Sequence, residues 1–149
     1  MRETVLEVND LYTRFRTRHG EVRAVNGVSF EIAPGETLGL VGESGCGKTV
    51  TALSLVGLID PPGEIYSGEV LLDEQNLLEL NRKELREIRG KEIAFVFQDP
   101  LSSLNPVLSI GTQLTETIIA HERVTRDAAR LRAVDLLDRV GLPGPEKLL

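Results

Sequence analysis

The sequence predicts an α/β fold, and three features of its pattern lead to that prediction. The first third of the chain is rich in β-forming residues, with turn residues between the runs. A short apolar run at residues 37–41 is followed by a glycine-rich loop and then by apolar residues at helical spacing. The last third, from about residue 110, shows helical spacing almost throughout. With 149 residues, the chain is long enough for one ordinary domain or part of a larger one.

Two strands are predicted in the first third. Residues 5–15 carry β-forming side chains, and residues 28–32 alternate apolar with polar side chains, as a half-exposed strand does. Residues 16–23 between them are predicted to form the exposed end of a hairpin. We interpret the arginines of this hairpin end as solvated, with a contact to a phosphate or a ribose as the alternative.

The glycine-rich loop reads Gly42-Glu43-Ser44-Gly45-Cys46-Gly47-Lys48-Thr49, which is the G-x-x-x-x-G-K-[ST] pattern of a nucleotide-phosphate loop. The glycines allow the backbone to curl so that its N–H groups point at phosphate oxygens. Lys48 adds a positive charge for the β- and γ-phosphates, and the hydroxyl of Thr49 is placed to hold Mg²⁺. A plain turn between a strand and a helix requires neither Lys48 nor Thr49, so the pattern favours a phosphate site.

The segments on either side of the loop support this interpretation. Residues 37–41 are typical of a strand that is buried on both faces, and residues 49–58 are predicted to form a helix. The loop therefore ends at a helix N-terminus, whose partial charge of about +0.5 favours a bound phosphate.

Further elements follow a break at residues 60–63. A strand is predicted at residues 69–73, and Asn81 is predicted to cap a helix over residues 82–89. Glutamates interleave with the arginines of that helix, so we interpret it as a solvated surface helix with side chains Arg82, Arg86 and Arg89.

The second half begins with a predicted buried strand at residues 92–98 and a proline-containing loop that ends at Pro106. Helices are predicted at residues 110–122 and 125–140, and the glycines and prolines of residues 141–145 end the second one. An apolar stripe along this second helix consists of Ala129, Ala133, Leu136, Leu137 and Val140.

Composition narrows the functional classes. The formal net charge of −6 argues against nonspecific nucleic-acid binding as the main activity. Cys46 is the one cysteine, so no disulfide forms within these residues, which fits a reducing cytoplasm; a redox or metal role for Cys46 is the alternative to an ordinary loop position. No apolar run reaches the length of about 20 residues that spans a membrane. If the protein acts at a membrane, it must therefore do so through a partner protein.

A second motif lies at the end of the strand predicted at residues 92–98. Ligands of open α/β sheets bind at the carboxyl ends of strands, so Gln98 could share a pocket with Lys48. A glutamine amide in that position can hold Mg²⁺ through its oxygen or orient an attacking water. A glutamine at a strand exit would carry little weight on its own.

The order of the phosphate loop, then Phe97-Gln98-Asp99-Pro100, then helices resembles the nucleotide-binding domain of ABC transporters. Within that family, Ser103-Leu104-Asn105-Pro106 is similar to the dipeptide/oligopeptide importer ATPases, as are residues 41–48 and the opening Leu6-Glu7-Val8-Asn9-Asp10-Leu11. The resemblance covers essentially all 149 residues.

The resemblance implies an α/β P-loop NTPase of the ABC type, with an N-terminal antiparallel β subdomain, the start of a helical subdomain and an incomplete core sheet. Residues 1–98 would be the partial ATP-binding core, with the antiparallel β subdomain and the phosphate loop. Residues 99–149 would be the glutamine loop and the start of the helical subdomain.

The resemblance also implies roles for individual residues. Lys48 and Gln98 would be catalytic, and Thr49 and Gln98 would bind the Mg²⁺ that accompanies ATP. Phe15 would stack on the adenine, with Tyr12 as the second candidate and ordinary packing of Phe15 as the remaining alternative. The residues expected to contact the nucleotide are Phe15, Gly42, Ser44, Gly45, Cys46, Gly47, Lys48, Thr49 and Val50.

The family further implies partners. Residues 98–106 would contact transmembrane permease subunits, and a second ATP-binding subunit, identical or different, would complete the ATP site. A substrate-binding protein would take part indirectly, and no nucleic acid is expected. The location would be cytoplasmic and peripheral, on the inner face of the cell membrane.

Three family motifs have no match in the sequence: the Leu-Ser-Gly-Gly-Gln signature, the catalytic glutamate after a strand ending in aspartate, and the switch histidine. His19 and His121 match no switch position. We therefore expect these residues to bind ATP without hydrolysing it by themselves, as a fragment of a longer protein or a truncated gene product.

Several functions stay open. A peptide-importer ATP-binding subunit is the first, and a non-catalytic remnant that binds nucleotide or a partner is the second. A GTPase is disfavoured because no Asn-Lys-x-Asp string is present, and a nucleic-acid-handling ABC ATPase is a further alternative. The cargo could be a dipeptide, a longer peptide, nickel or glutathione.

Overall fold

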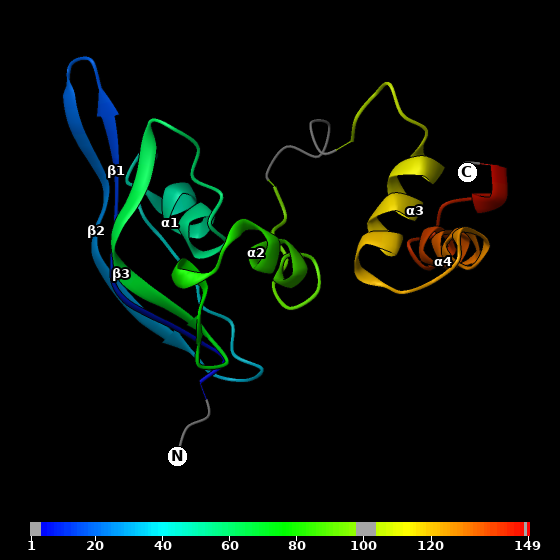
Figure 1. The fold of residues 1–149 in the computed structure, drawn as a ribbon, viewed down its shortest axis with the longest axis horizontal. Helices are drawn as coiled ribbons and strands as arrows, with labels where there is room; N and C mark the ends of the chain where they lie inside the picture. The colour runs from blue at the N-terminus through cyan, green and yellow to red at the C-terminus, as the bar shows by residue number, and fades with distance from the viewer. Residues whose placement is uncertain (1–3, 98–103, 148) are drawn as a thin grey trace. The chain divides into compact units, whose positions relative to one another are not determined.

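An antiparallel sheet and a pair of packed helices are the main features of the computed structural model, in which residues 4–97, 104–147 and 149 are described (Figure 1). The chain divides into two compact units, Met1–Arg89 and Gly90–Leu149. The sheet belongs to the first unit and the helix pair to the second. The functional division predicted between residues 98 and 99 stays a prediction.

The sheet has the strand order β2-β1-β3-β4, and every neighbouring pair is antiparallel. This confirms the predicted antiparallel β subdomain. The central strand β1 pairs with β2 from Leu6 opposite Ile32 to Thr17 opposite Gly20, so residues 16–23 form the hairpin end as predicted. The strands are β1 (Leu6–Thr17), β2 (Gly20–Ile32), β3 (Gly63–Leu72) and β4 (Gln75–Asn76).

β3 is longer than the strand predicted at residues 69–73, because Gly68 does not interrupt it. Gly68 has φ +106, and a Cβ on it would lie 2.5 Å from the carbonyl oxygen of Asp10. The pairing of β1 with β3 shifts register between Asn9 and Tyr12 at the same place. The glycine therefore allows a bulge and a close backbone approach inside a continuous strand.

One core fills the first unit. Its buried side chains come from all three long strands and from η1 (Leu77–Glu79), and helix α1 (Lys48–Leu55) packs against it through Val50 and Leu55. Figure 1 shows α1 beside the sheet. α2 (Arg82–Ile88) adds Leu85 and Ile88. The buried members are Leu6, Val8, Leu11, Val25, Val70 and Leu77.

α2 begins where the sequence predicts. The Asn81 side chain accepts from the backbone N–H groups of Lys83 and Glu84, and the Glu84 carboxylate accepts from the Asn81 N–H at 2.8 Å. This reciprocal capping box satisfies N–H groups that a helix start otherwise leaves without partners.

Two predicted buried strands are wrong in this structure. Residues 37–41 and 92–97 form no strand of the sheet in the described part of the chain. Val41 and Val96 are each 92% exposed. An apolar run becomes a buried strand only when neighbouring strands pair with both of its edges, and neither run has such neighbours here. This agrees with the predicted incomplete core sheet.

The second unit contains α3 (Ile110–His121) and α4 (Arg126–Arg139), followed by η2 (Pro145–Lys147). Ser109 and Thr125 cap the two helices through their side-chain oxygens. Ala129 and Ala133 are fully buried against Ile118, since their small side chains let the helices approach closely. Val140 was predicted in the same stripe, but it is 72% exposed because α4 ends at Arg139. No helix among the described residues is long and apolar enough to cross a membrane.

Candidate functional site

The glycine-rich loop is exposed and leads directly into α1. Gly45 and Gly47 have φ values of +82 and +99, the left-handed region that glycine enters without the strain of a Cβ. Gly47 is also the N-cap of α1, where no side chain caps the first N–H groups. The N–H of Cys46 donates to the carbonyl oxygen of Glu43 at 3.3 Å, which closes the loop on itself. Donors at a helix start are therefore open to an anion.

At Gly47 the loop packs closely against strand β2 of the sheet. A Cβ at this position would collide with the carbonyl oxygen of Ala24, which belongs to β2. Gly42 is restricted in a similar way, because a Cβ there would lie 2.7 Å from the Sγ of Cys46. Glycine is thus required at position 47 for reasons of space as well as backbone conformation, whereas at position 42 the Cys46 side chain would have to move.

The ammonium of Lys48 folds over the loop. Its Nζ donates to the carbonyl oxygens of Gly42 at 2.7 Å and Glu43 at 2.6 Å, and it lies 3.5 Å from the Sγ of Cys46. A positive charge, a helix N-terminus and curled backbone N–H groups thus meet in one exposed place. This combination suits a polyanion such as a row of phosphates.

Thr49 and Val50 occupy the first turn of α1. Thr49 is exposed, whereas Val50 is half-buried and packs on the core of the first unit. A hydroxyl oxygen is a ligand type that Mg²⁺ accepts, so Thr49 fits as one Mg²⁺ ligand. Gln98, the second predicted ligand and a predicted catalytic residue, lies outside the described residues. The described part of the chain contains no cluster of three or more His, Cys, Asp or Glu side chains that could hold a metal.

Phe15 is half-buried near the hairpin end of β1 and pairs with Val22 and Gly63 in the ladder. If Gly63 carried a Cβ, that atom would lie 2.6 Å from the Cε1 of Phe15 and 2.7 Å from the Cγ2 of Ile59. The absent side chain of Gly63 therefore leaves room for the ring. Ile59 follows α1 in the chain, so Phe15 lies near the C-terminal end of the phosphate-loop helix.

Tyr12, the alternative to Phe15, lies on the face of the sheet that carries Tyr66. The two tyrosine rings are 5.6 Å apart, and the Arg14 guanidinium lies 4.4 Å from the centre of the Tyr66 ring. The Tyr12 hydroxyl also covers Gly27, since a Cβ there would lie 2.9 Å away. The Tyr12 ring is thus engaged in packing against other side chains of the sheet.

The hairpin arginines pair with carboxylates at the surface. Arg16 lies 2.9 Å from Glu64, and Arg23 lies 3.0 Å from Glu21. Arg14 contacts both carboxylates, at 2.6 Å for Glu64 and 3.1 Å for Glu21. The hydrogen bond from Arg14 lowers the pKa of Glu64, and the hydrogen bond from Arg23 lowers the pKa of Glu21. The expectation that the arginines of residues 16–23 are solvated is confirmed for Arg16 and Arg23, whose side chains are each 63% exposed while they pair with carboxylates.

Two side-chain contacts of α1 have no signal in the sequence. The Nε and Nη2 of Arg89 donate to the carbonyl oxygens of Val56 and Gly57, each at 2.7 Å, at the C-terminal end of α1. The interpretation of Arg89 as a solvated residue is therefore wrong, because this guanidinium binds the open carbonyls of another helix. The hydroxyls of Thr13 and Ser54 lie 2.8 Å apart in the core and join β1 to α1.

The loop predicted to contact a partner is described only at its end. Residues 98–103 lie outside the described residues, whereas Leu104, Asn105 and Pro106 are exposed. Asn105 is fixed to α3, because its N–H donates to the Oε1 of Gln113 at 2.8 Å and its carbonyl oxygen accepts from Nε2 at 3.0 Å. One glutamine side chain thus anchors the chain that enters α3.

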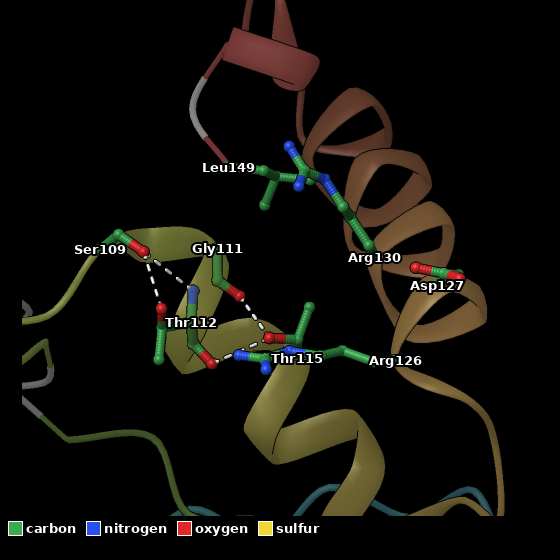
Figure 2. Close-up of a pocket in the computed structure, with 8 residues that line it drawn as sticks. All are labelled: Ser109, Gly111, Thr112, Thr115, Arg126, Asp127, Arg130 and Leu149. Carbon is green, nitrogen blue, oxygen red and sulfur yellow. Dashed lines mark hydrogen bonds between the residues drawn. The ribbon is translucent and has the colours of Figure 1, made fainter.

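The second unit has a pocket of about 160 Å³ between α3, α4 and Leu149 (Figure 2). Figure 2 shows Arg126 extending from α4 toward Thr115 of α3. The Thr115 hydroxyl donates to the carbonyl oxygen of Gly111 at 2.7 Å, and the Thr112 N–H donates to the Ser109 hydroxyl at 3.1 Å. The pocket thus includes none of the predicted site residues, and the hydroxyls that line it bond within α3 and its cap.

Comparisons with known proteins agree with this geometry. The ABC transporter family model matches residues 25–148. The oligopeptide transport ATP-binding protein OppD of Bacillus subtilis (strain 168) is 49% identical over 144 residues, which are 96% of this chain and 40% of that protein. The dipeptide transport ATP-binding protein DppD of the same organism is 44% identical over 148 residues, which are 99% of this chain and 44% of that protein.

A solved structure described as the dimeric structure of MJ0796, a bacterial ABC transporter cassette, has a similar fold. The TM-score is 0.76 at 25% sequence identity, over 89% of this chain and 56% of that one. The chain spans less than half the length of the two curated relatives. Because the family model covers most of the chain, including the phosphate loop and both helices of the second unit, the chain belongs to the ABC transporter family.

Proposed function

We propose that the chain is the N-terminal part of an ATP-binding subunit of an ABC importer, which couples ATP binding and hydrolysis to peptide uptake. The observation that carries this proposal is the exposed loop at residues 42–49. Gly45 and Gly47 hold left-handed conformations, and the Lys48 ammonium donates to the carbonyl oxygens of Gly42 and Glu43. Membership of the ABC transporter family makes ATP the expected ligand of that loop.

Each residue of the site has a role in this proposal. The backbone N–H groups of the loop and of the first turn of α1 bind the phosphates, and Lys48 neutralises the β- and γ-phosphate charge. Thr49 supplies one oxygen to Mg²⁺, and Gln98 supplies a second or orients the attacking water. The contributing loop and helix residues are Gly42, Ser44, Gly45, Cys46, Gly47, Lys48, Thr49 and Val50.

Phe15 is proposed as the platform for the adenine, in preference to Tyr12. Phe15 lies near Ile59 and the end of α1, whereas Tyr12 packs with Tyr66 on a face that also carries Arg14. A base stacks on an aromatic π-face, and we assign that role to the half-buried Phe15.

The partners and the cargo are proposed from the relatives. The two curated relatives are named as ATP-binding proteins of oligopeptide and dipeptide transport. We assign the same class of cargo here, with permease subunits contacted through residues 98–106, a second ATP-binding subunit and, indirectly, a substrate-binding protein. The place of action would be the cytoplasmic face of the cell membrane.

A second candidate is a nucleotide-binding remnant without turnover. Within these residues the family signature, the catalytic glutamate and the switch histidine have no match. Phosphoryl transfer needs a group that positions water in addition to the phosphate loop and the metal. We therefore propose that these 149 residues bind ATP but do not hydrolyse it by themselves.

Peptide uptake in the native host tests the proposed function. A chromosomal Lys48→Ala substitution is expected to abolish uptake of labelled dipeptide or oligopeptide while uptake of an unrelated sugar continues. Lys83→Ala is the matched control, since Lys83 is an exposed lysine on α2. Unchanged peptide uptake with loss of another solute would overturn the peptide assignment, and unchanged uptake of every solute would overturn the transport role.

A further inference from the structure

The feature that carries a further inference is the buried hydroxyl pair of Thr13 and Ser54. Both residues are 0% exposed, and their oxygens are 2.8 Å apart. The Ser54 hydroxyl donates its one hydrogen to the carbonyl oxygen of Val50 at 2.7 Å, so Thr13 must be the donor in the pair. The bond therefore has a fixed direction, from the sheet to the helix.

Thr13 lies on β1 and Ser54 on α1, and both elements contribute apolar side chains to one buried core. Val8, Leu11 and Val25 belong to the same buried core, and Val50 and Leu55 of α1 pack against it. Two apolar side chains of similar shape would fill this place at least as well, since a buried polar group needs its partner to offset lost hydration. A hydroxyl pair adds what an apolar pair lacks, namely a defined separation and orientation of two elements.

The two elements joined by the pair carry the two ends of the nucleotide site. β1 carries Phe15 two residues after Thr13, and α1 carries Lys48 and Thr49 in its first turn. A ligand that touches both Phe15 and the phosphate loop must span the distance between them. Its affinity therefore depends on the spacing between β1 and α1.

We propose that Thr13 and Ser54 form a positioning pair, which sets the spacing between the adenine platform on β1 and the phosphate loop on α1. This proposal rests on the proposed ATP-binding function. ATP binding by itself does not require such a pair. The pair should affect the affinity for a ligand with both a base and a triphosphate, and not the affinity for a triphosphate alone.

The decisive variant is the double substitution Thr13→Val with Ser54→Ala. Removing both hydroxyls leaves neither one buried without a partner, so the protein is expected to fold. Binding of Mg-ATP and of Mg-tripolyphosphate to the purified protein is then measured by titration calorimetry. We expect ATP affinity to fall by about tenfold while tripolyphosphate affinity stays within about twofold of the original protein.

Two controls complete the design. Thr115→Val removes a buried hydroxyl whose bonds, to the carbonyl oxygens of Gly111 and Thr112, stay within α3. It is expected to change neither affinity. Thr13→Ser keeps the hydroxyl and is expected to keep the ATP affinity, which separates positioning by the hydrogen bond from simple filling of space.

The outcomes distinguish this proposal from the function on which it rests. Equal losses for ATP and tripolyphosphate, or no loss for either, in the double variant would overturn the positioning pair. Phe15→Ala is run in parallel, since it should lower ATP affinity alone if Phe15 is the platform. Lys48→Ala should lower both affinities, and its failure to do so would overturn the proposed nucleotide site itself.

Discussion

The Nη2 of Arg89 lies 2.7 Å from the carbonyl oxygen of Gly57, just past the C-terminal end of the phosphate-loop helix. Its Nε makes a second bond of 2.7 Å to the carbonyl oxygen of Val56. A guanidinium is well suited to this position because the last carbonyls of a helix carry partial negative charge and have no partners within the helix. α1 is thus held at its start by Gly47 against Ala24 and beyond its end by Arg89.

Arg89→Met should destabilise the protein. The substitution keeps much of the side-chain length but leaves two carbonyls without a donor, so the free energy of unfolding should fall by about 1–3 kcal/mol. Urea unfolding followed by circular dichroism measures the change. Arg86→Met is the matched control, since Arg86 is an exposed arginine of α2 and its loss should change the free energy of unfolding by under about 0.5 kcal/mol. Equal effects of the two substitutions would contradict the assigned role of Arg89.

Alanine at Gly47 and at Gly45 should have different costs. Both glycines have positive φ, so each Gly→Ala change carries a strain of about 1–2 kcal/mol. At Gly47 the new Cβ also collides with the carbonyl oxygen of Ala24, whereas at Gly45 it meets nothing within 4 Å. Moving the backbone apart should add about 1–3 kcal/mol at Gly47. If urea unfolding gave the same free-energy loss for both variants, the loop would not be seated on β2 as described.

Acid should remove the contribution of Glu64 to stability. Its pKa in the folded protein lies below the ordinary value of 4.5, first because of its hydrogen bond from Arg14. A carboxylate with a lowered folded pKa stabilises the protein above its unfolded pKa, and that contribution is lost as pH falls through the folded pKa. The urea midpoint of Glu64→Gln should therefore lie below that of the original protein at pH 7, and the gap should close below about pH 4.5.

Ionic strength gives an independent check on the same ion pairs. Because the carboxylate is exposed, the difference caused by Glu64→Gln should be small and should shrink further in 1 M salt, where the screening length is about 3 Å. Glu69→Gln on the same strand is the control, because no ion pair of Glu69 occurs among the described residues. A gap for Glu64→Gln that persists at low pH would show that charge is not its cause.

Local patterns in the sequence are enough to predict part of this structure. The cap at Asn81 and the starts of α3 and α4 depend on residues within one helical turn, and the structure confirms each of them. The phosphate loop is also local, so its motif indicates the conformations of Gly45 and Gly47. These features depend little on what the rest of the chain does.

Other features depend on contacts between distant residues, which no local pattern contains. Residues 37–41 have the composition of a buried strand, yet Val41 is exposed because no neighbouring strand pairs with that run in the described part of the chain. In the sequence, nothing distinguishes Arg89 from the solvated residues near it. Its contact with Gly57, 32 positions away, appears only in the folded structure. The bond between Thr13 and Ser54, 41 positions apart, is equally invisible to pattern analysis.

The central claim is that residues 42–49 bind the phosphates of ATP, and titration of the purified protein with Mg-ATP tests it most directly. Lys48 donates to the carbonyls of Gly42 and Glu43, so Lys48→Ala removes both the loop's own contacts and its positive charge. We predict that the original protein and the Lys83→Ala control bind Mg-ATP equally, and that Lys48→Ala loses at least about a hundredfold in affinity. Equal affinity of Lys48→Ala and the original protein would contradict the account.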